Sequence, residues 1–93
     1  TKVADIYHTF LEYTSNITVF DPWADAEKVK KEYGIITISG NLDSLQGQFD
    51  AVILAVAHKE FTQTNIRKFL NSKNGVVYDV KGVLNRNEID GRL

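Results

Sequence analysis

The sequence contains no cysteine and carries almost no net charge. Without thiols, the chain has no disulfide, no thiolate metal site and no cysteine nucleophile of its own. Its 11 basic and 12 acidic residues are interspersed and give a formal net charge of -1. No basic cluster could displace many counterions from a phosphate backbone, so we predict no nucleic-acid partner.

Long apolar runs and clusters of metal ligands are also missing. No segment approaches the roughly 20 apolar residues that span a bilayer, so we predict no membrane partner. The amino end is amphipathic rather than continuously apolar, which is unlike a signal peptide, and we expect a cytoplasmic protein. The two histidines, His8 and His58, are isolated in different sequence contexts, so we expect no metal site.

A glycine-rich turn between a first strand and a first helix is absent as well. Dinucleotide-binding folds hold the pyrophosphate with such a turn. The chain instead begins on a helical pattern, with apolar residues at positions 3, 6, 7, 10 and 11. We therefore expect no cofactor-binding residue and no complete catalytic set within this sequence.

The residues that are present alternate between helix and strand patterns. A chain of 93 residues, 43% hydrophobic and 25% charged, predicts one small globular domain. We expect helices at 3–11 and 24–33, strands at 17–20, 35–38, 49–57 and 76–80, and a third helix capped by Thr62 or Thr64 with Ile66, Phe69 and Leu70 as its apolar stripe. The polar tail, residues 85–93, is expected to be a helical turn or a loop. This alternation implies an α/β fold with parallel strands and helices on both faces.

Polar residues close three of the predicted strands. In open parallel sheets, ligands bind beyond the carboxyl ends of the strands. The three ends are Asp21-Pro22-Trp23, Ala57-His58-Lys59 and Asp79-Val80-Lys81-Gly82. We expect them to gather an acid, a histidine and two lysines on one side of the sheet, where we predict a ligand site.

Lys81 is the strongest candidate in this group. A lysine just beyond a buried strand, followed by Gly82, can present its ammonium to a phosphate as a point charge. The same lysine could equally reach into solvent, and its position alone does not separate the two roles. His58 fits a structural hydrogen-bonding role better than a catalytic one.

The end of the first predicted strand is less informative. Asp21 could hydrogen-bond a ribose hydroxyl, but capping of the following helix is the favoured role. Trp23 and Tyr33 are expected to be packing residues. These residues therefore add no candidate to the ligand site.

Several stretches together resemble one enzyme family. TKVADI, DPWAD, DAVILAVAHKEF, YDVKGVL and DGRL resemble the carboxyl-terminal, UDP-binding domain of the UDP-glucose/GDP-mannose dehydrogenase family. Within the family they are most similar to the UDP-N-acetyl-hexosamine 6-dehydrogenases of the Vi-polysaccharide type. The resemblance covers nearly all of the chain in the same order. AVAHKEF and YDVKGVL together are fairly specific, whereas each alone is weak.

The resemblance implies that residues 1–93 are one domain of an NAD-dependent enzyme. Such enzymes oxidise the C6 alcohol of a UDP-sugar to an acid for surface-polysaccharide synthesis, and they are expected to be homodimers. NAD belongs to an amino-terminal domain and the catalytic cysteine lies upstream, so this chain alone is expected to be inactive. The resemblance implies a substrate-binding set of Lys81, Gly82, His58 and Lys59. The alternative is a free-standing α/β nucleotide-binding or regulatory module without enzymatic activity.

The resemblance also implies a Rossmann-like three-layer sandwich with a mainly parallel sheet that lacks its usual first strand. Without that strand, the strand at 17–20 exposes unpaired backbone groups. We expect one of three outcomes. A second chain fills the gap by strand exchange, the strands at 17–20 and 49–57 pair directly, or the order of the sheet changes.

Overall fold

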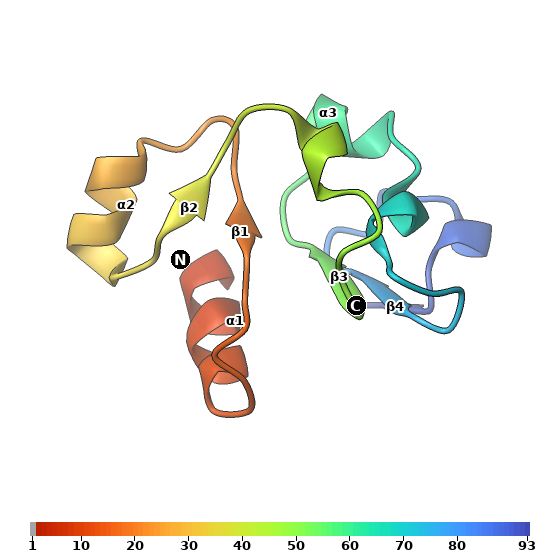
Figure 1. Cartoon of the computed structure of the whole chain (residues 1–93), viewed down its shortest axis with the longest axis horizontal. Coiled ribbons are helices and arrows are strands. Elements are labelled where there is room, and N and C mark those ends of the chain that lie inside the picture. The colour runs from red at the N-terminus through yellow and green to blue at the C-terminus, as the bar shows by residue number, and fades with distance from the viewer. Residues whose placement is uncertain (1) are drawn as a thin grey trace. The chain divides into compact units, whose positions relative to one another are not determined.

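The computed structural model describes residues 2–93, and the chain divides into two compact units, Thr1–Leu42 and Asp43–Leu93 (Figure 1). Every strand pair in the two units is parallel. The prediction of a Rossmann-like α/β fold with parallel strands is therefore confirmed. The strands form two small sheets, however, rather than the single sheet that we expected.

The first unit contains two helices and a two-stranded sheet. Its elements are helix α1 (Lys2–Leu11), strand β1 (Val19–Phe20), helix α2 (Ala26–Tyr33) and strand β2 (Thr37–Ile38). Strands β1 and β2 flank α2 in the chain and pair in register, which makes a small β-α-β unit. The α1 helix contacts the end of α2 through the ring of His8, whose Nε2 lies 3.3 Å from the Tyr33 carbonyl oxygen.

Helix α2 begins two residues later than the sequence predicts. Asp25 is its N-cap, and the Asp25 carboxylate accepts a hydrogen bond from the Lys28 N–H at 3.2 Å. Asp21 therefore does not cap the helix itself. Its Oδ1 accepts the N–H groups of Trp23 and Ala24 at 3.0 and 3.1 Å, and so holds the turn that precedes the helix.

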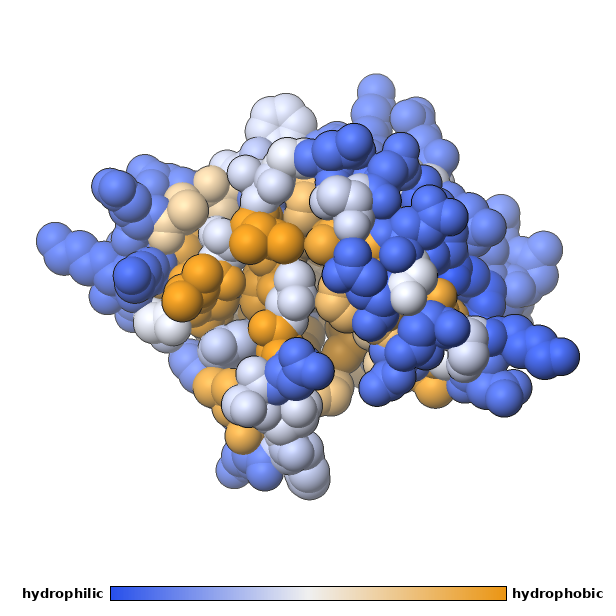
Figure 2. Space-filling model, viewed as in Figure 1, coloured by the Kyte–Doolittle hydropathy of each residue, from blue (hydrophilic) through white to orange (hydrophobic). Residues whose placement is uncertain are grey.

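The first unit buries little apolar surface. Among its described residues, only Ala4 and Ile35 are buried. Trp23, which we expected to pack, is 70% exposed, so that prediction is wrong. In the view of Figure 2, hydrophobic residues reach the surface over the part of the chain that carries β1 and β2.

The second unit has a three-stranded sheet in the order β3-β4-β5. Its strands are β3 (Ala51–Leu54), β4 (Val76–Asp79) and β5 (Gly91–Arg92). Its helical segments are η1 (Leu42–Leu45, which starts at the boundary), α3 (Lys59–Thr62), η2 (Ile66–Phe69) and η3 (Arg86–Glu88), with all but α3 in the 3-10 form. Its apolar core consists of Leu54, Phe61, Ile66, Phe69, Leu70, Val77 and Leu84.

The apolar run at 49–57 gives a shorter strand than we expected. Strand β3 is paired with β4 from Ala51 to Leu54, and the Val80 N–H closes this ladder by donating to the Leu54 carbonyl at 2.9 Å. Because β4 ends in register with β3, the residues after Leu54 have no strand partner in the second unit and leave the sheet. The apolar run at 49–57 predicts a buried segment, but the length of β4, the strand that pairs with β3, sets where β3 ends.

The third predicted helix is replaced by two short ones. Helix α3 starts before Thr62, and η2 starts after Asn65, whose side chain accepts the Arg67 N–H at 3.2 Å. The cap is therefore Asn65 rather than Thr62 or Thr64. The predicted apolar stripe is confirmed, since Ile66, Phe69 and Leu70 are all buried.

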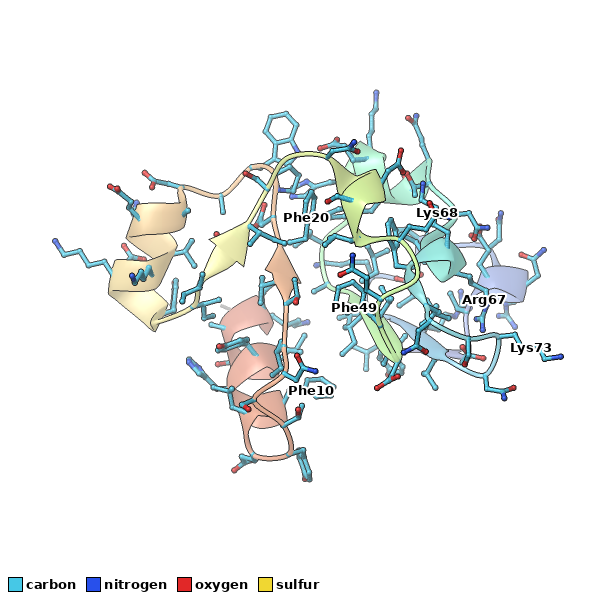
Figure 3. The ribbon with its side chains drawn as sticks, viewed as in Figure 1. Phe10, Phe20, Phe49, Arg67, Lys68 and Lys73 are labelled. Carbon is cyan, nitrogen blue, oxygen red and sulfur yellow. The ribbon has the colours of Figure 1, made fainter. Side chains whose placement is uncertain are left out.

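The polar tail contains a strand that the sequence did not reveal. Residues 86–88 form the expected helical turn, but Gly91–Arg92 continue as β5 beside β4. The Arg67 guanidinium holds this segment in place (Figure 3). Its Nη1 donates to the Glu88 carbonyl at 3.1 Å and to Asp90 Oδ2 at 3.0 Å, and its Nη2 donates to the Gly75 carbonyl at 3.1 Å.

The structure shows how the strands pair within each unit. In the first unit β1 pairs with β2, and in the second unit β3 pairs with β4. The three outcomes expected for the incomplete sheet, strand exchange with a second chain among them, stay predictions.

Candidate functional site

The three strands of the second unit end at the same level. Leu54 of β3 lies beside Asp79 of β4, and Asp79 lies beside Arg92 of β5. Because the strands are parallel, the residues that follow β3 and β4 emerge at one end of this sheet. We call this end the strand-end rim. It carries His58 and Lys59 after β3, and Lys81 and Gly82 after β4.

Asp79 shapes the segment that follows β4. Its side chain is completely buried, and both carboxylate oxygens accept backbone hydrogen bonds. Oδ1 accepts the N–H groups of Lys81 and Gly82 at 3.1 and 2.9 Å, and Oδ2 accepts the N–H of Leu84 at 2.8 Å. We call residues 80–84 the Lys81 loop, since these three bonds fold the backbone around the carboxylate.

Lys81 lies at the exposed tip of this loop. Across residues 2–93, the structure gives its ammonium no hydrogen bond and no ion pair. Gly82 follows with φ of 67°, a left-handed conformation that glycine adopts without strain, and a Cβ added at this position would meet no atom within 4 Å. The backbone beside the ammonium is therefore not covered by a side chain at this position.

His58 and Lys59 begin helix α3 on the same rim. The His58 carbonyl accepts the N–H groups of Phe61 and Thr62, and the imidazole lies 5.6 Å from the Phe61 ring. These contacts place the His58 backbone and ring at the start of α3, and the structural role that the sequence favoured stays a prediction. Lys59 is exposed at the first position of the helix. Contact of either residue with a ligand stays a prediction.

Two residues of this region were missed or misread from the sequence. Asp79 was grouped with the polar residues that close a strand, but the structure buries it beneath the Lys81 loop. Arg92 was placed in a tail without a strand, whereas β5 carries it to the same level as Asp79. The spacing of Asp79 before Lys81 and Gly82 was the available signal, because aspartate often accepts backbone N–H groups two or three residues ahead.

Asp21, the acid expected to join this site, belongs to the first unit. Its carboxylate holds the turn before α2, as described above. Within the second unit, His58, Lys59 and Lys81 all follow strands that end at the same level, and their gathering in one site stays a prediction.

Asp90 keeps β5 attached to β4 through a charged contact. The Val77 N–H donates to Asp90 Oδ2 at 2.8 Å, and the Arg67 guanidinium donates to the same oxygen. These contacts hold the pKa of Asp90 below its ordinary value of 3.8, with the Val77 hydrogen bond as the largest cause and Arg67 next. Burial opposes this shift only in part.

Because the pKa of Asp90 is lowered in the folded state, the β4–β5 contact should weaken in acid. A carboxyl whose pKa is lower in the folded state stabilises that state above its unfolded pKa, and the stabilisation is lost as the pH falls through the folded pKa. We therefore expect the Val77 amide proton signal to shift at a pH below 3.8, the ordinary aspartate value. NMR titration of Val77 checks this, with Asp90→Asn as the control. An equal shift in the control variant would contradict the assignment to Asp90.

The turn before α2 does not have the features of a dinucleotide-binding turn. The turn before α2 contains no glycine, and the Asp25 carboxylate already accepts an N–H at the amino end of that helix, where a pyrophosphate would meet a like charge. No cluster of three or more His, Cys, Asp or Glu side chains suitable for a metal occurs among residues 2–93. No helix in the same range has the length and apolar character needed to cross a bilayer.

Comparison with known proteins gives a consistent result. Residues 1–86 match the sequence profile described as UDP-glucose/GDP-mannose dehydrogenase family, UDP binding domain. Two proteins named UDP-N-acetyl-D-glucosamine 6-dehydrogenase align with the whole chain, one from Salmonella typhi at 40% identity and one from Pseudomonas aeruginosa at 43%. Protein CapL of Staphylococcus aureus is 34% identical over 97% of the chain. No solved structure matches it.

The aligned region is a small part of these relatives. The chain spans 22% of the length of each of the two dehydrogenases and 21% of the length of CapL. The relatives are therefore several times longer than this chain.

Proposed function

This chain belongs to the UDP-glucose/GDP-mannose dehydrogenase family as a UDP-binding domain, and we propose that it holds the UDP part of a UDP-N-acetyl-hexosamine for a 6-dehydrogenase. The names of the two relatives that align with the whole chain support this substrate class. The parent enzyme would oxidise the sugar C6 alcohol to a uronic acid for a surface polysaccharide. In this proposal NAD would bind to another domain of the parent enzyme, as the family resemblance implies, and the parent is expected to be a homodimer.

The observation that carries the proposal is the free ammonium of Lys81 on a loop fixed to the strand-end rim. A UDP-sugar presents two phosphates, and a lysine without a charge partner can approach them as a point charge. Gly82 leaves the adjacent backbone open, and Lys59 adds a second exposed cation after β3. We assign the diphosphate to Lys81 and Gly82, with His58 and Lys59 beside it.

Replacing Lys81 by alanine tests this assignment. We expect the dissociation constant of UDP for this chain to rise about tenfold, the value of one charge-assisted contact. Titration calorimetry, or amide shifts of residues 80–84 during UDP titration, measures the change. Lys73→Ala is the matched control, because Lys73 is an exposed lysine that precedes β4 and so lies at the other end of that strand.

In the parent enzyme, the same substitution should affect binding of the UDP-sugar substrate but not binding of NAD. We expect Lys81→Ala to raise the KM for the UDP-sugar far more than the KM for NAD. Equal affinity of wild type and variant for UDP and for the UDP-sugar would remove Lys81 from the site.

A further inference from the structure

We propose that Asp79 is a positioning residue that fixes the Lys81 loop in the conformation that binds the ligand, an inference that rests on the proposed UDP site. Asp79 cannot touch a ligand itself, because its side chain is fully buried. It would act on binding through the backbone of Lys81 and Gly82.

The hydrogen bonds of Asp79 point to this role. A buried carboxylate is costly unless its oxygens are hydrogen-bonded. All three donors to Asp79 come from residues 81, 82 and 84, and no side chain of another element donates to it in the described part of the chain. The carboxylate therefore joins no other element to β4 and serves the shape of this one loop.

The loop is anchored on both sides of its exposed tip. At its start the Val80 N–H donates to the Leu54 carbonyl at 2.9 Å, and at its end Leu84 is buried in the core. Between these anchors, the backbone turns through the positive φ of Gly82. Asp79 holds the middle of this path, so it fixes the point from which the Lys81 side chain extends.

A fixed backbone affects affinity because disorder must be removed on binding. A lysine side chain is flexible, and a mobile loop beneath it would add to the entropy lost when the ammonium meets a phosphate. With the loop already folded around Asp79, only the side chain remains to be ordered. The contribution of Lys81 to binding should therefore depend on Asp79.

A double-mutant cycle on this chain, with UDP as the ligand, measures that dependence. Asp79→Asn keeps the shape of the side chain but replaces one carboxylate oxygen by an NH2 group. This group cannot accept a hydrogen bond, so at least one of the three backbone N–H donors loses its acceptor. We expect Asp79→Asn to raise the dissociation constant of UDP about three- to tenfold and Lys81→Ala to raise it about tenfold. If Asp79 acts through Lys81, the double variant should bind within about twofold of Lys81→Ala alone.

A second variant disturbs the loop without touching the core carboxylate. Gly82→Ala would strain the positive φ at this position, while its methyl group would meet no atom within 4 Å. It therefore changes the loop conformation and not the packing. We expect it to weaken UDP binding. Because Gly82 is itself assigned to the diphosphate, part of this loss should persist when Lys81 is alanine, and a larger loss with Lys81 present than without it indicates action through the loop. If Asp79→Asn loses the amide shift dispersion of β3 and β4, this difference for Gly82→Ala decides between the two roles.

The outcomes separate this inference from the proposed function. If Asp79→Asn weakens UDP binding by the same factor in the wild-type chain and in Lys81→Ala, Asp79 has an ordinary structural role. That result would overturn the inference, while the UDP site would stand. An unchanged affinity of Lys81→Ala for UDP would overturn both. Nonadditive losses in either cycle would support the positioning role.

Discussion

Phe69→Ala is expected to lower the free energy of unfolding of the second unit by about 3–5 kcal/mol, the usual cost of emptying a buried aromatic site. Phe69 is 4% exposed and ends the η2 helix, where Lys68 precedes it and Leu70 follows it in the chain. Its ring also lies 5.5 Å below the Lys68 ammonium, a contact that alanine would remove. A small domain has about 5–15 kcal/mol to lose, so this variant should be close to unfolding at room temperature.

Phe10→Ala provides the matched control. Phe10 is 40% exposed in α1 of the first unit, so the same truncation removes far less buried surface. We expect a loss of about 1 kcal/mol or less. Urea unfolding, followed by amide exchange in β4, compares the two variants. Similar losses for both phenylalanines would show that η2 does not pack on the core as the structure has it.

Arg67→Ala is expected to release β5 and to cost about 2–4 kcal/mol, because three acceptors would lose a charged donor. Two of the acceptors are the backbone carbonyls of Gly75, which directly precedes β4, and Glu88, which lies between β4 and β5 in the chain. The third is the carboxylate of Asp90, which would also lose its positive partner. One side chain thus joins the end of the chain to the start of β4.

Amide exchange at residue 90 reports this release, since the Asp90 N–H donates to the Val77 carbonyl at 2.8 Å. We expect its protection to collapse in Arg67→Ala while the amides of β3 stay protected. Lys73→Ala is the control, because the exposed Lys73 makes no hydrogen bond or ion pair in the range that the structure describes (Figure 3). Unchanged protection at residue 90 would mean that β5 is held by other contacts.

Local patterns predicted the parts of the fold that depend on short-range periodicity. The apolar stripe of Ile66, Phe69 and Leu70 was predicted because it recurs at helical spacing, and it is buried. Strand β5 was not, because two residues carry no periodicity. Its position depends on Arg67, which is more than 20 residues away in the chain. The apolar run at 49–57 was read as too long a strand, since the end of β4 sets the end of its ladder.

The same distinction applies to the candidate site. Parallel strands place their carboxyl ends together, so the shared level at which β3 and β4 end followed from topology. The burial of Asp79 did not follow, because an acid at a strand end is normally expected in solvent. Only the folded backbone shows that three N–H groups surround its carboxylate.

Strand β3 has a further consequence for handling the protein. It is the edge of its sheet, and its sequence, AVIL, is wholly apolar. The outer N–H and C=O groups of such a strand attract other extended chains, which makes it a starting point for precipitation. Aggregation of the isolated chain should therefore increase steeply with its concentration, and ligand titrations are best made on dilute samples.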